Sequence, residues 1–566
     1  MAAVGNSYLA EAIAYSRYAF TQWHREPSAP SYGCFDRQYW GWKKKDLPDA
    51  ALQQAIALIL RLADHTGETR SLPPLLDAYV SFMRRIQRTD GSFDQIYPYE
   101  KAPGVVHDIL SSLIFLWRSP LLSQPSRLDL EGVMARAVDY ALRSDEKHGE
   151  IANHFAHYAW ELINYGETFA NEAAQAGGRR YLDRTLALFN GREGWFREYD
   201  GADAGYQSRC IAFLSRVAEQ TGDEQVWSVL GRAGGFLDRM TMPDGSFHPM
   251  LGVRSTALTY VSGFERLALR FPELARLADR VHAAWAVGRS LTPGLLDFEN
   301  GLRIADDAYD AAELRERRLV LGDRGRMAAD DALAAFDLPE AGLSRRCVEA
   351  GSATRTIHVA TRLGGVVIVH DCQSDEEARL AFEDSGYLVE LSDGSRWVMR
   401  HAGSGAQINV GDSEISLEAG FVRALHEDMS SLQLLLLRSL NLTVLRSQFV
   451  GDLFKKLVVR RLISGRQHLP LSCRRRIAIE AGRVVLEDRF GIPSSVAARL
   501  KGARLLRCRR AIANHMASSR YFQPQEMELQ QPWTEELPVE LVDGLTVRRE
   551  VPAADSAAQI PSISRA

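Results

Sequence analysis

Apolar residues recur at helical spacing through roughly the first 300 residues of the chain. The stretch 51–63 shows the pattern clearly, with alanine, leucine and isoleucine three and four positions apart. Gly67 follows shortly after, and glycine just beyond a periodic segment is a common helix end. Similar helix ends are expected at 164–167 and 220–223. We therefore predict that residues 1–302 form a series of helices.

A glycine-containing loop recurs along this helical part at intervals of 58, 58, 45, 51 and 56 residues, counted from glycine to glycine. Intervals of this size fit a unit of two helices, and such units bury their apolar faces against neighbouring units. Six hairpins closed into a ring form an (α/α)6 toroid, which we favour over an open solenoid. The loops are 32–35, 90–93, 148–150, 194–196, 244–247 and 300–302.

The composition changes after this helical part. Residues 303–340 are charged and rich in alanine, which predicts a helical connector. Residues 341–552 contain many short β-branched segments and a hairpin turn at Asp393-Gly394, a pattern typical of an antiparallel β-sandwich. Residues 553–566 are small and polar and predict a disordered tail. The expected strands are 354–362, 364–370, 386–398, 407–410, 414–417, 439–445, 457–462, 476–480 and 483–490.

The expected fold class is thus α+β multidomain, with an N-terminal toroid followed by a C-terminal sandwich. The sandwich is rich in basic pairs and triplets. Solvated strand faces account for such residues, and a positive surface facing an anionic chain is the alternative. These residues include Arg345, Arg346, Lys455, Lys456, Arg460, Arg461, Arg474, Arg475, Arg476, Arg507, Arg509 and Arg510.

Charge, cysteine usage and hydropathy narrow the class of protein. A net charge of −4 over 566 residues is close to neutral, so no strong overall field draws in nucleic acid or a membrane. Six scattered cysteines without a CxxC pair predict reduced thiols, and no zinc-type spacing is present. The first 19 residues read as an amphipathic helix rather than a signal peptide. The apolar run 432–437 is interrupted by Gln433 and followed by Arg438, so we expect a cytoplasmic protein without a membrane span.

Polar groups that suit a sugar-binding groove concentrate in the stretch 153–206. Asn153 lies where a helix begins, either as an N-cap or as an amide that donates to a sugar carboxylate. His154, His157 and Tyr158 occupy positions i, i+3 and i+4 and share one helix face. In a toroid that face points into the lumen, where an imidazole or phenol exchanges protons. For His157, a place in the core is the alternative.

A glycine-bounded loop at the end of this stretch combines aromatic rings with carboxylates. It carries Trp195, Glu198, Tyr199, Asp203 and Tyr206. A tyrosine acts as base and acid when nearby cations lower its pKa. The candidate cations are Arg197, Arg209 and Arg254, and further walls of the groove are expected from Tyr97, Tyr99, His107 and His248.

Several chemistries lack their motifs in this sequence. There is no Walker A sequence, no dinucleotide-binding glycine pattern after a strand, and no GxSxG or HExxH. The acidic spacing near residue 200 does not match an EF-hand loop, and the DxDD-type signature of terpene cyclases is missing. We therefore expect neither a metal nor a cofactor.

With these residues in view, the sequence resembles the heparinase II/III-like and related (α/α)-toroid polysaccharide lyases, which include alginate and chondroitin lyases. The resemblance spans both domains in arrangement, and its motif support lies in a few short stretches. It implies that Asn153-His154 opens an inner helix and supplies the asparagine that neutralises a substrate carboxylate. It also implies that Tyr206, at the end of a glycine-rich loop, is the catalytic tyrosine.

The family's His-Gly-His-Ala-Asp-like segment in the sandwich is absent from this sequence. The histidines that remain as substitutes are His358, His370 and His401.

The resemblance implies a carbon–oxygen lyase that cleaves an acidic polysaccharide or oligosaccharide by β-elimination at a uronic acid. Asn153, with Arg254, would acidify the C5 proton, and a histidine or Tyr206 would remove it. Tyr206 would then protonate the leaving oxygen, and stabilising the enolate-like intermediate is the main demand on the site.

Two alternatives stay open. One is another enzyme on the same scaffold, either a uronyl C5-epimerase or a hydrolase with paired carboxylates such as Glu198 and Asp203. The other is a non-catalytic glycan-binding component of exopolysaccharide or cell-surface glycan biosynthesis.

Overall fold

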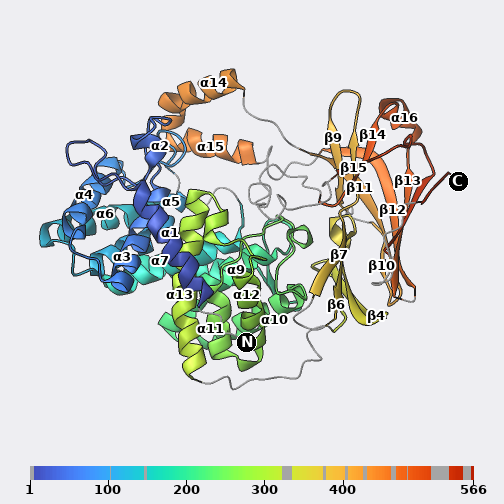
Figure 1. Ribbon diagram of the computed structural model, residues 1–566. Helices are drawn as coiled ribbons and strands as arrows, with labels where there is room; N and C mark the ends of the chain where they lie inside the picture. The colour runs from blue at the N-terminus through green and yellow to red at the C-terminus, as the bar shows by residue number, and fades with distance from the viewer. Residues whose placement is uncertain are drawn as a thin grey trace.

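The computed structural model describes residues 6–101, 103–145, 149–321, 334–373, 378–401, 406–424, 430–459, 467–480, 482–510, 534–551 and 562–565. Over these residues, a helical N-terminal region is followed by a region of antiparallel strands (Figure 1). This division is the one that the hydrophobic pattern predicts. Among the helices of the described ranges, none combines the length and apolar character needed to cross a bilayer.

The helical region runs from α1 to α13 and includes one short strand pair, β1 (Phe189–Asn190) with β2 (Trp195–Phe196). Its helices are α1 (Ser7–Gln22), α2 (Arg37–Trp40), α3 (Ala55–Thr66), α4 (Leu72–Ile86), α5 (Pro103–Arg118), α6 (Gln124–Arg143), α7 (Ala152–Thr168), α8 (Glu172–Ala187), α9 (Ala204–Thr221), α10 (Glu224–Met240), α11 (Ser262–Arg270), α12 (Ala275–Ala286) and α13 (Phe298–Val320).

The odd-numbered helices follow one another in space. α3 packs against α5, α5 against α7, α7 against α9, α9 against α11, α11 against α13, and α13 against α3. The remaining long helices lie beside them, with α6 against α5, α8 against α7, α10 against α9, α12 against α11, and α1 against both α13 and α3. A single cluster of buried apolar side chains extends through all of these helices.

Two of the three predicted helix ends are confirmed. α3 ends at Gly67 (φ 73°) and α9 at Gly222 (φ 68°), each in the left-handed conformation that glycine adopts most easily. Gly166 does not end α7, which continues to Thr168. A Cβ on Gly166 would overlap the side chain of Gln175, so this glycine allows α8 to approach α7 closely.

The repeated glycine loops share one packing device. Gly33, Gly91, Gly194 and Gly245 all have positive φ, and a Cβ on any of them would overlap a backbone carbonyl. Those carbonyls belong to Ala78 on α4, Arg136 on α6, Arg232 on α10 and Arg280 on α12. Gly149 has open space around it, and its neighbour His148 lies outside the described residues. Gly301 lies inside α13.

The strand region contains two antiparallel sheets of five and ten strands. The five-stranded sheet has the order β3-β4-β5-β6-β7, and the ten-stranded sheet has the order β15-β14-β8-β9-β11-β12-β13-β16-β17 with β10 on β11. The strands are β3 (Phe336–Leu338), β4 (Leu343–Ala350), β5 (Ala353–Ala360), β6 (Val366–Cys372), β7 (Ala378–Asp384), β8 (Tyr387–Glu390), β9 (Arg396–His401), β10 (Ile408–Val410), β11 (Glu414–Arg423), β12 (His468–Glu480), β13 (Arg483–Gly491), β14 (Arg504–Cys508), β15 (Thr534–Leu537), β16 (Leu545–Val551) and β17 (Ser562–Arg565).

The five-stranded sheet has one face toward the helices and one toward the larger sheet. Ile357 and Val369 belong to the apolar cluster shared with the ten-stranded sheet. Val366 and Ile368 belong to the cluster of the helical region. Side chains alternate between the two faces of a strand, so neighbours on β6 such as Ile368 and Val369 belong to different clusters.

Two of the predicted strands are wrong. Residues 439–442 and 457–459 lie in helices α14 (Ser431–Leu442) and α15 (Gln448–Val459), and the rest of 457–462 lies outside the described residues. α14 begins with a capping box in which Ser430 and Gln433 satisfy each other's backbone N–H groups. Leucine favours helix, so the capping box and the leucine run outweigh the β-branched residues nearby.

The boundaries also differ from the expected ones. The first part of the predicted connector 303–340 is the continuation of α13, which packs against α1 and α11. Of the predicted tail, residues 562–565 form β17 and pair with β16, and the others lie outside the described residues.

The basic triplet 474–476 shows how strand alternation divides such a cluster. The side chains of Arg474 and Arg476 on β12 are 77% and 42% exposed, whereas that of Arg475 is fully buried between Asp384 and Asp488. A uniformly positive surface is therefore not formed by this triplet.

Candidate active site

The loop that carries Arg254 is fixed to the strand region. Arg400 on β9 donates to the carbonyl oxygens of Met250 (3.3 Å) and Gly252 (3.0 Å) and to the Ser255 hydroxyl (2.8 Å). His248, at the start of the same loop, lies 3.0 Å from Glu383 at the end of β7. The strand region thus holds this loop at two places, through Glu383 and through Arg400.

Asp203 joins this loop to the first turn of α9. It caps α9 by accepting from the backbone N–H of Tyr206 (3.2 Å). Its other oxygen accepts from the backbone N–H groups of Arg254 (3.0 Å) and Thr256 (3.3 Å). Burial raises the pKa of Asp203, and these N–H groups act in the opposite direction. Asp203 was predicted to bind substrate, and the structure places it 1% exposed as the anchor that brings Tyr206 and Arg254 together.

A cation and a second phenol meet at this anchor. The guanidinium carbon of Arg254 lies 4.6 Å from the ring centroid of Tyr199, a favourable cation–π distance. Tyr199 has φ 59°, a left-handed conformation that strains a non-glycine residue. Strain of this kind persists where surrounding contacts impose it and is frequent at functional sites. Tyr206 remains partly exposed.

Asn153 is fully buried beside this group, in the first turn of α7. Its backbone N–H and its Nδ2 donate to the two carboxylate oxygens of Glu198 at 2.8 and 2.7 Å. Its Oδ1 accepts from Arg209 at 3.3 Å. Ile151, not Asn153, is the N-cap of α7. Asn153 therefore positions Glu198 and Arg209, and its amide does not reach an open surface.

The Glu198 carboxyl is 0% exposed. Burial raises its pKa to about 8, while the two hydrogen bonds from Asn153 and the nearby Arg209 oppose that shift. Its predicted role in substrate binding is not favoured by this placement, because every contact of the carboxyl is internal.

A polar chain continues from Arg209 down α7. The guanidinium of Arg209 is 3.2 Å from Nδ1 of His157, and Nε2 of His157 is 3.5 Å from Glu161. Because Nδ1 accepts from Arg209, the neutral imidazole carries its proton on Nε2. Burial and the charge of Arg209 hold the pKa of His157 well below its ordinary value. Burial also raises the pKa of Glu161 to about 8, although Ser111 donates to it.

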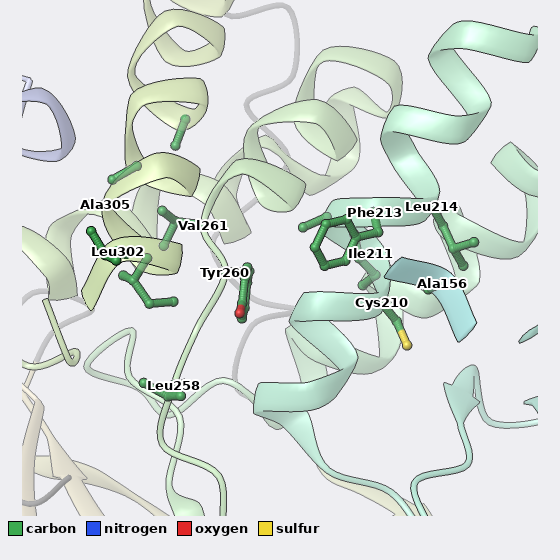
Figure 2. Close-up of a cluster of buried hydrophobic side chains, with 14 of the residues drawn as sticks. Ala156, Cys210, Ile211, Phe213, Leu214, Leu258, Tyr260, Val261, Leu302 and Ala305 are labelled. Atoms are coloured by element: carbon green, nitrogen blue, oxygen red, sulfur yellow. The ribbon is translucent and has the colours of Figure 1, made fainter. Parts of the chain in front are cut away.

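This chain borders a cavity of about 230 Å³ among α3, α5, α7, α9 and α13. Its wall combines five guanidinium groups with carboxylates. The charged residues include Arg61, Arg118, Arg209, Arg216, Arg303, Asp108, Asp306, Asp307 and Asp310. Tyr260, which precedes α11, points into the same region, with Leu258 below it and Phe213 across from it in Figure 2.

The aromatic residues predicted on α7 form a separate buried group. The ring of Tyr158 stacks on His107 at 3.9 Å and meets Tyr181 edge-on at 5.3 Å. His154 lies 6.1 Å from Tyr158, and His107 lies 6.3 Å from His157. Tyr158 and His107 are 3% and 1% exposed, so they shape the wall behind the site rather than its surface.

The other residues predicted to line the groove differ in burial. Trp195 is buried in the helical core, and its indole N–H donates to Glu193 at 2.9 Å. Tyr97 is partly exposed, and burial raises the pKa of its phenol. Tyr99 lies between the guanidinium groups of Arg88 (4.2 Å) and Arg446 (4.4 Å), so the strand region contributes to this wall through Arg446.

Two of the strand-region histidines that the sequence offers as substitutes, His358 and His370, are buried. His358 and His370 are each 2% exposed and lie on the sheet face that packs on the helices. Burial lowers the pKa of both imidazoles. For His401, the structure describes only its backbone in β9. The residue that reaches across is its neighbour Arg400, which no sequence motif marks.

No group of three or more histidine, cysteine, aspartate or glutamate side chains with metal-binding geometry occurs among the described residues. The polar groups at the candidate site are arginines, phenols and buried carboxyls.

Neither a protein-family model nor a curated protein matches this sequence. Several solved structures resemble it over most of its length. A chondroitin AC lyase from Streptomyces coelicolor in complex with chondroitin sulphate has a TM-score of 0.48 at 11% identity, covering 89% of this chain and 68% of that one. A heparinase III has a TM-score of 0.45 at 10% identity, covering 86% of this chain and 71% of that one. A Paenibacillus xanthan lyase has a TM-score of 0.47 at 9% identity, covering 88% of this chain and 46% of that one.

These likenesses are of fold only, and the roles of the site residues are argued from their own contacts. In fold, the chain is similar to the heparinase-like polysaccharide lyases, as the sequence resemblance leads one to expect.

Proposed function

We propose that this protein is a lyase-like enzyme that cleaves a uronate-containing polysaccharide or oligosaccharide by β-elimination. The observation that carries the proposal is the anchoring of Arg254 and Tyr206 on one carboxylate, Asp203, with Tyr199 under the Arg254 guanidinium. The backbone N–H groups of Arg254 and Tyr206 share this anchor, and the Arg254 side chain is 6% exposed, which supports assigning both residues to one site.

The proposed architecture around this site is an (α/α)6 toroid followed by a β-sandwich. The packing order α3, α5, α7, α9, α11, α13 and back to α3 supports a closed ring, with α4, α6, α8, α10, α12 and α1 as its outer layer. The apolar cluster shared by the two sheets supports a sandwich. The site then lies at the end of the ring that meets the strand region.

The proposed reaction divides the chemistry between two side chains. Arg254 neutralises the uronate carboxylate and thereby acidifies the proton on C5. Tyr206, as phenolate, takes that proton, the C5–H electron pair forms the C4–C5 double bond, and the C4–O4 bond breaks. The phenol then gives its proton to O4 of the leaving sugar. General base catalysis contributes roughly 10²–10⁴-fold, and a positioned charge at the oxyanion roughly 10²–10³-fold.

Asn153 and Arg209 act as positioning residues in this mechanism. Asn153 holds Glu198. Glu198 forms one isolated β-bridge with Ile151 and another with Gly201, and the second bridge joins the two ends of the turn that contains Tyr199. Arg209 ties Asn153 to His157. His154, which is partly exposed at the start of α7, is the histidine closest in sequence to this group and stays a candidate for the base.

The hydrolase alternative is disfavoured by the carboxylates themselves. Glu198 and Asp203 are 0% and 1% exposed, and their oxygens accept internal N–H groups. A retaining or inverting hydrolase needs one carboxyl to protonate the leaving oxygen and another to reach the sugar or a water. An epimerase uses the same base without cleavage, and the assay below separates it. Cytoplasmic location and a role in exopolysaccharide metabolism stay predictions.

The test is an ultraviolet-absorbance assay for the unsaturated product, run on uronate-containing polysaccharides and oligosaccharides with the full chain. The expected result is a rise in absorbance that falls at least about 10²-fold in Tyr206→Phe and in Arg254→Ala. The matched control is Tyr18→Phe, which removes a phenol that is 47% exposed on α1 and leaves the rate unchanged. Exchange of the C5 proton with solvent, without cleavage, would instead identify an epimerase.

A further inference from the structure

The insertion between β11 and β12 exposes an unusual amount of apolar surface. Among the described residues, nine of the twenty large apolar side chains that are exposed lie between positions 432 and 457. They are Leu432, Leu434, Leu435, Leu436, Leu442, Val444, Phe449, Leu453 and Leu457, and each is at least 52% exposed. Contiguous apolar surface of this kind marks an interaction site.

The distribution of these residues is unlike that of an ordinary surface helix. A helix on a globular protein turns one apolar stripe to the core and a polar face to water. In α14, the consecutive residues Leu434, Leu435 and Leu436 are 52%, 66% and 59% exposed, so apolar side chains leave the helix in several directions without cover. A helix with this composition is stable in a nonpolar environment on more than one side.

The same segment carries a local positive charge. Residues 430–459 contain four basic residues and one acidic residue, a net charge of +3, whereas the whole chain has −4. The basic residues are Arg438, Arg446, Lys455 and Lys456, and the acidic one is Asp452. The rest of the chain therefore has a net charge of −7.

The two helices project away from the sheets that they connect. In Figure 1, α14 and α15 lie at the top of the molecule, over the helical region and apart from β11 and β12. Arg438 forms an ion pair with Asp46 (2.5 Å), and the Arg446 guanidinium lies over Tyr99. These contacts orient the hairpin and leave its leucines outward.

We propose that the α14–α15 hairpin binds the surface of an anionic lipid bilayer, with its leucines and Phe449 in the interfacial layer and Lys456, which is exposed, at the headgroups. Each helix has 12 residues, which is too short to span a bilayer and suits a segment lying in the interface plane. Exposed leucine and phenylalanine beside lysine and arginine are the composition of such segments.

Charge decides between a bilayer and other occupants. A second copy would cover the leucines but would bring two segments of +3 together. A nucleic acid or an acidic polysaccharide would match the charge and leave the leucines in water. Only an anionic surface with an apolar interior satisfies both features.

The test is flotation of the full chain with vesicles of three parts phosphatidylcholine to one part phosphatidylglycerol, and with pure phosphatidylcholine. The variant combines Leu435→Asp and Phe449→Asp, at positions 66% and 80% exposed. The control is Leu128→Asp, at a position on α6 that is 58% exposed. We expect flotation with the anionic vesicles, weaker flotation with the neutral ones or at high salt, a loss of roughly tenfold or more in the double variant, and no change in the control.

Three results would overturn the proposal. The first is no flotation with anionic vesicles, and the second is flotation that the double variant does not reduce. The third is a dimer, seen by light scattering, that the double variant converts to a monomer without any vesicle binding, because the hairpin would then be an interface between copies. None of these outcomes depends on the proposed reaction, since the hairpin variants leave Arg254 and Tyr206 in place.

Discussion

A buried network of charged groups in the sheets differs from a buried polar network among the helices. In the sheets, Arg475 and Arg549 bind Asp384 and Asp488, and all four side chains are at most 4% exposed. Among the helices, Arg209 connects Asn153 and His157 and borders the 230 Å³ cavity. The first network contacts only protein, whereas the second has one side on open space.

The difference shows that buried charge alone does not mark a functional site. Burial would raise the pKa of Asp384, but the guanidiniums of Arg549, Arg475 and Arg507 hold it at about 2. That strong perturbation serves the packing of the two sheets. The groups among the helices are perturbed too, and what separates them is the cavity that Arg209 and His157 border.

The largest expected effect comes from breaking the sheet network. Asp384→Ala leaves three guanidiniums without their shared carboxylate in the interior, which costs about 3–5 kcal/mol of the free energy of unfolding. Denaturant unfolding measures it. Asp393→Ala, in the hairpin turn after β8, is the control, because Asp393 is exposed. A loss below about 1 kcal/mol in Asp384→Ala would mean that the network is not structural.

A smaller effect on stability, with a clear effect on turnover, is expected from the helical network. Arg209→Ala removes the donor to both Asn153 and His157 and costs about 1–3 kcal/mol. It also lowers kcat/KM about 10²-fold, because the Glu198 loop loses its support. Arg209→Lys restores one donor and recovers part of the rate. Turnover equal to wild type in Arg209→Ala would remove Arg209 from the positioning role.

The carboxyl of Glu161 provides a pH-dependent comparison. Its pKa rises from 4.5 to about 8 on burial, so between these values the folded state holds a proton that the unfolded state has released. The contribution of Glu161 to stability therefore falls as the pH rises from 4.5 to 8 and is constant above 8. Glu161→Gln lacks this titration. In denaturant unfolding, the free energy of unfolding of Glu161→Gln minus that of wild type should rise by more than about 1 kcal/mol from pH 5 to pH 8. A difference that is independent of pH would contradict this assignment.

The smallest effect concerns the boundary between the regions. The side chain of Arg192 is 88% exposed and that of its partner Glu340 is 41% exposed, so Arg192→Ala should change stability by less than about 0.5 kcal/mol. Its neighbour Glu193 is buried and accepts the backbone N–H groups of Glu340 and Ala341 at 2.7 Å each. Glu193→Ala should cost about 1–3 kcal/mol in the same unfolding experiment. Equal effects of Arg192→Ala and Glu193→Ala would mean that the two hydrogen bonds accepted by Glu193 add nothing to the free energy of unfolding.

The sequence predicted the coarse fold well because its signals are local. Gly67 and Gly222 end helices, and four of the six repeated glycines occupy the same close contact with a backbone carbonyl. The α14–α15 hairpin is not predicted by the sequence pattern, because β-branched residues such as Thr443 and Val444 favour strands, whereas the capping box at Ser430 favours a helix.

The assignment of the candidate site stays a prediction. Several residues of the stretch 153–206 contact one another. Which of them are exposed and which have only internal partners depends on burial, which the sequence does not show. Asn153, Glu198 and Asp203 look alike as polar site residues, yet all three are buried with internal partners. Arg400 was missed because it acts from a strand far along the chain, with no motif around it.

The central claim is that Tyr206 carries out an elimination, and product analysis in water enriched in heavy oxygen tests it most directly. An elimination breaks the C4–O4 bond without adding water. We therefore predict an unsaturated uronate product that contains no heavy oxygen from the solvent, formed by wild type and at least about 10²-fold more slowly by Tyr206→Phe. Saturated products carrying one solvent oxygen, or equal rates in the two proteins, would contradict the account.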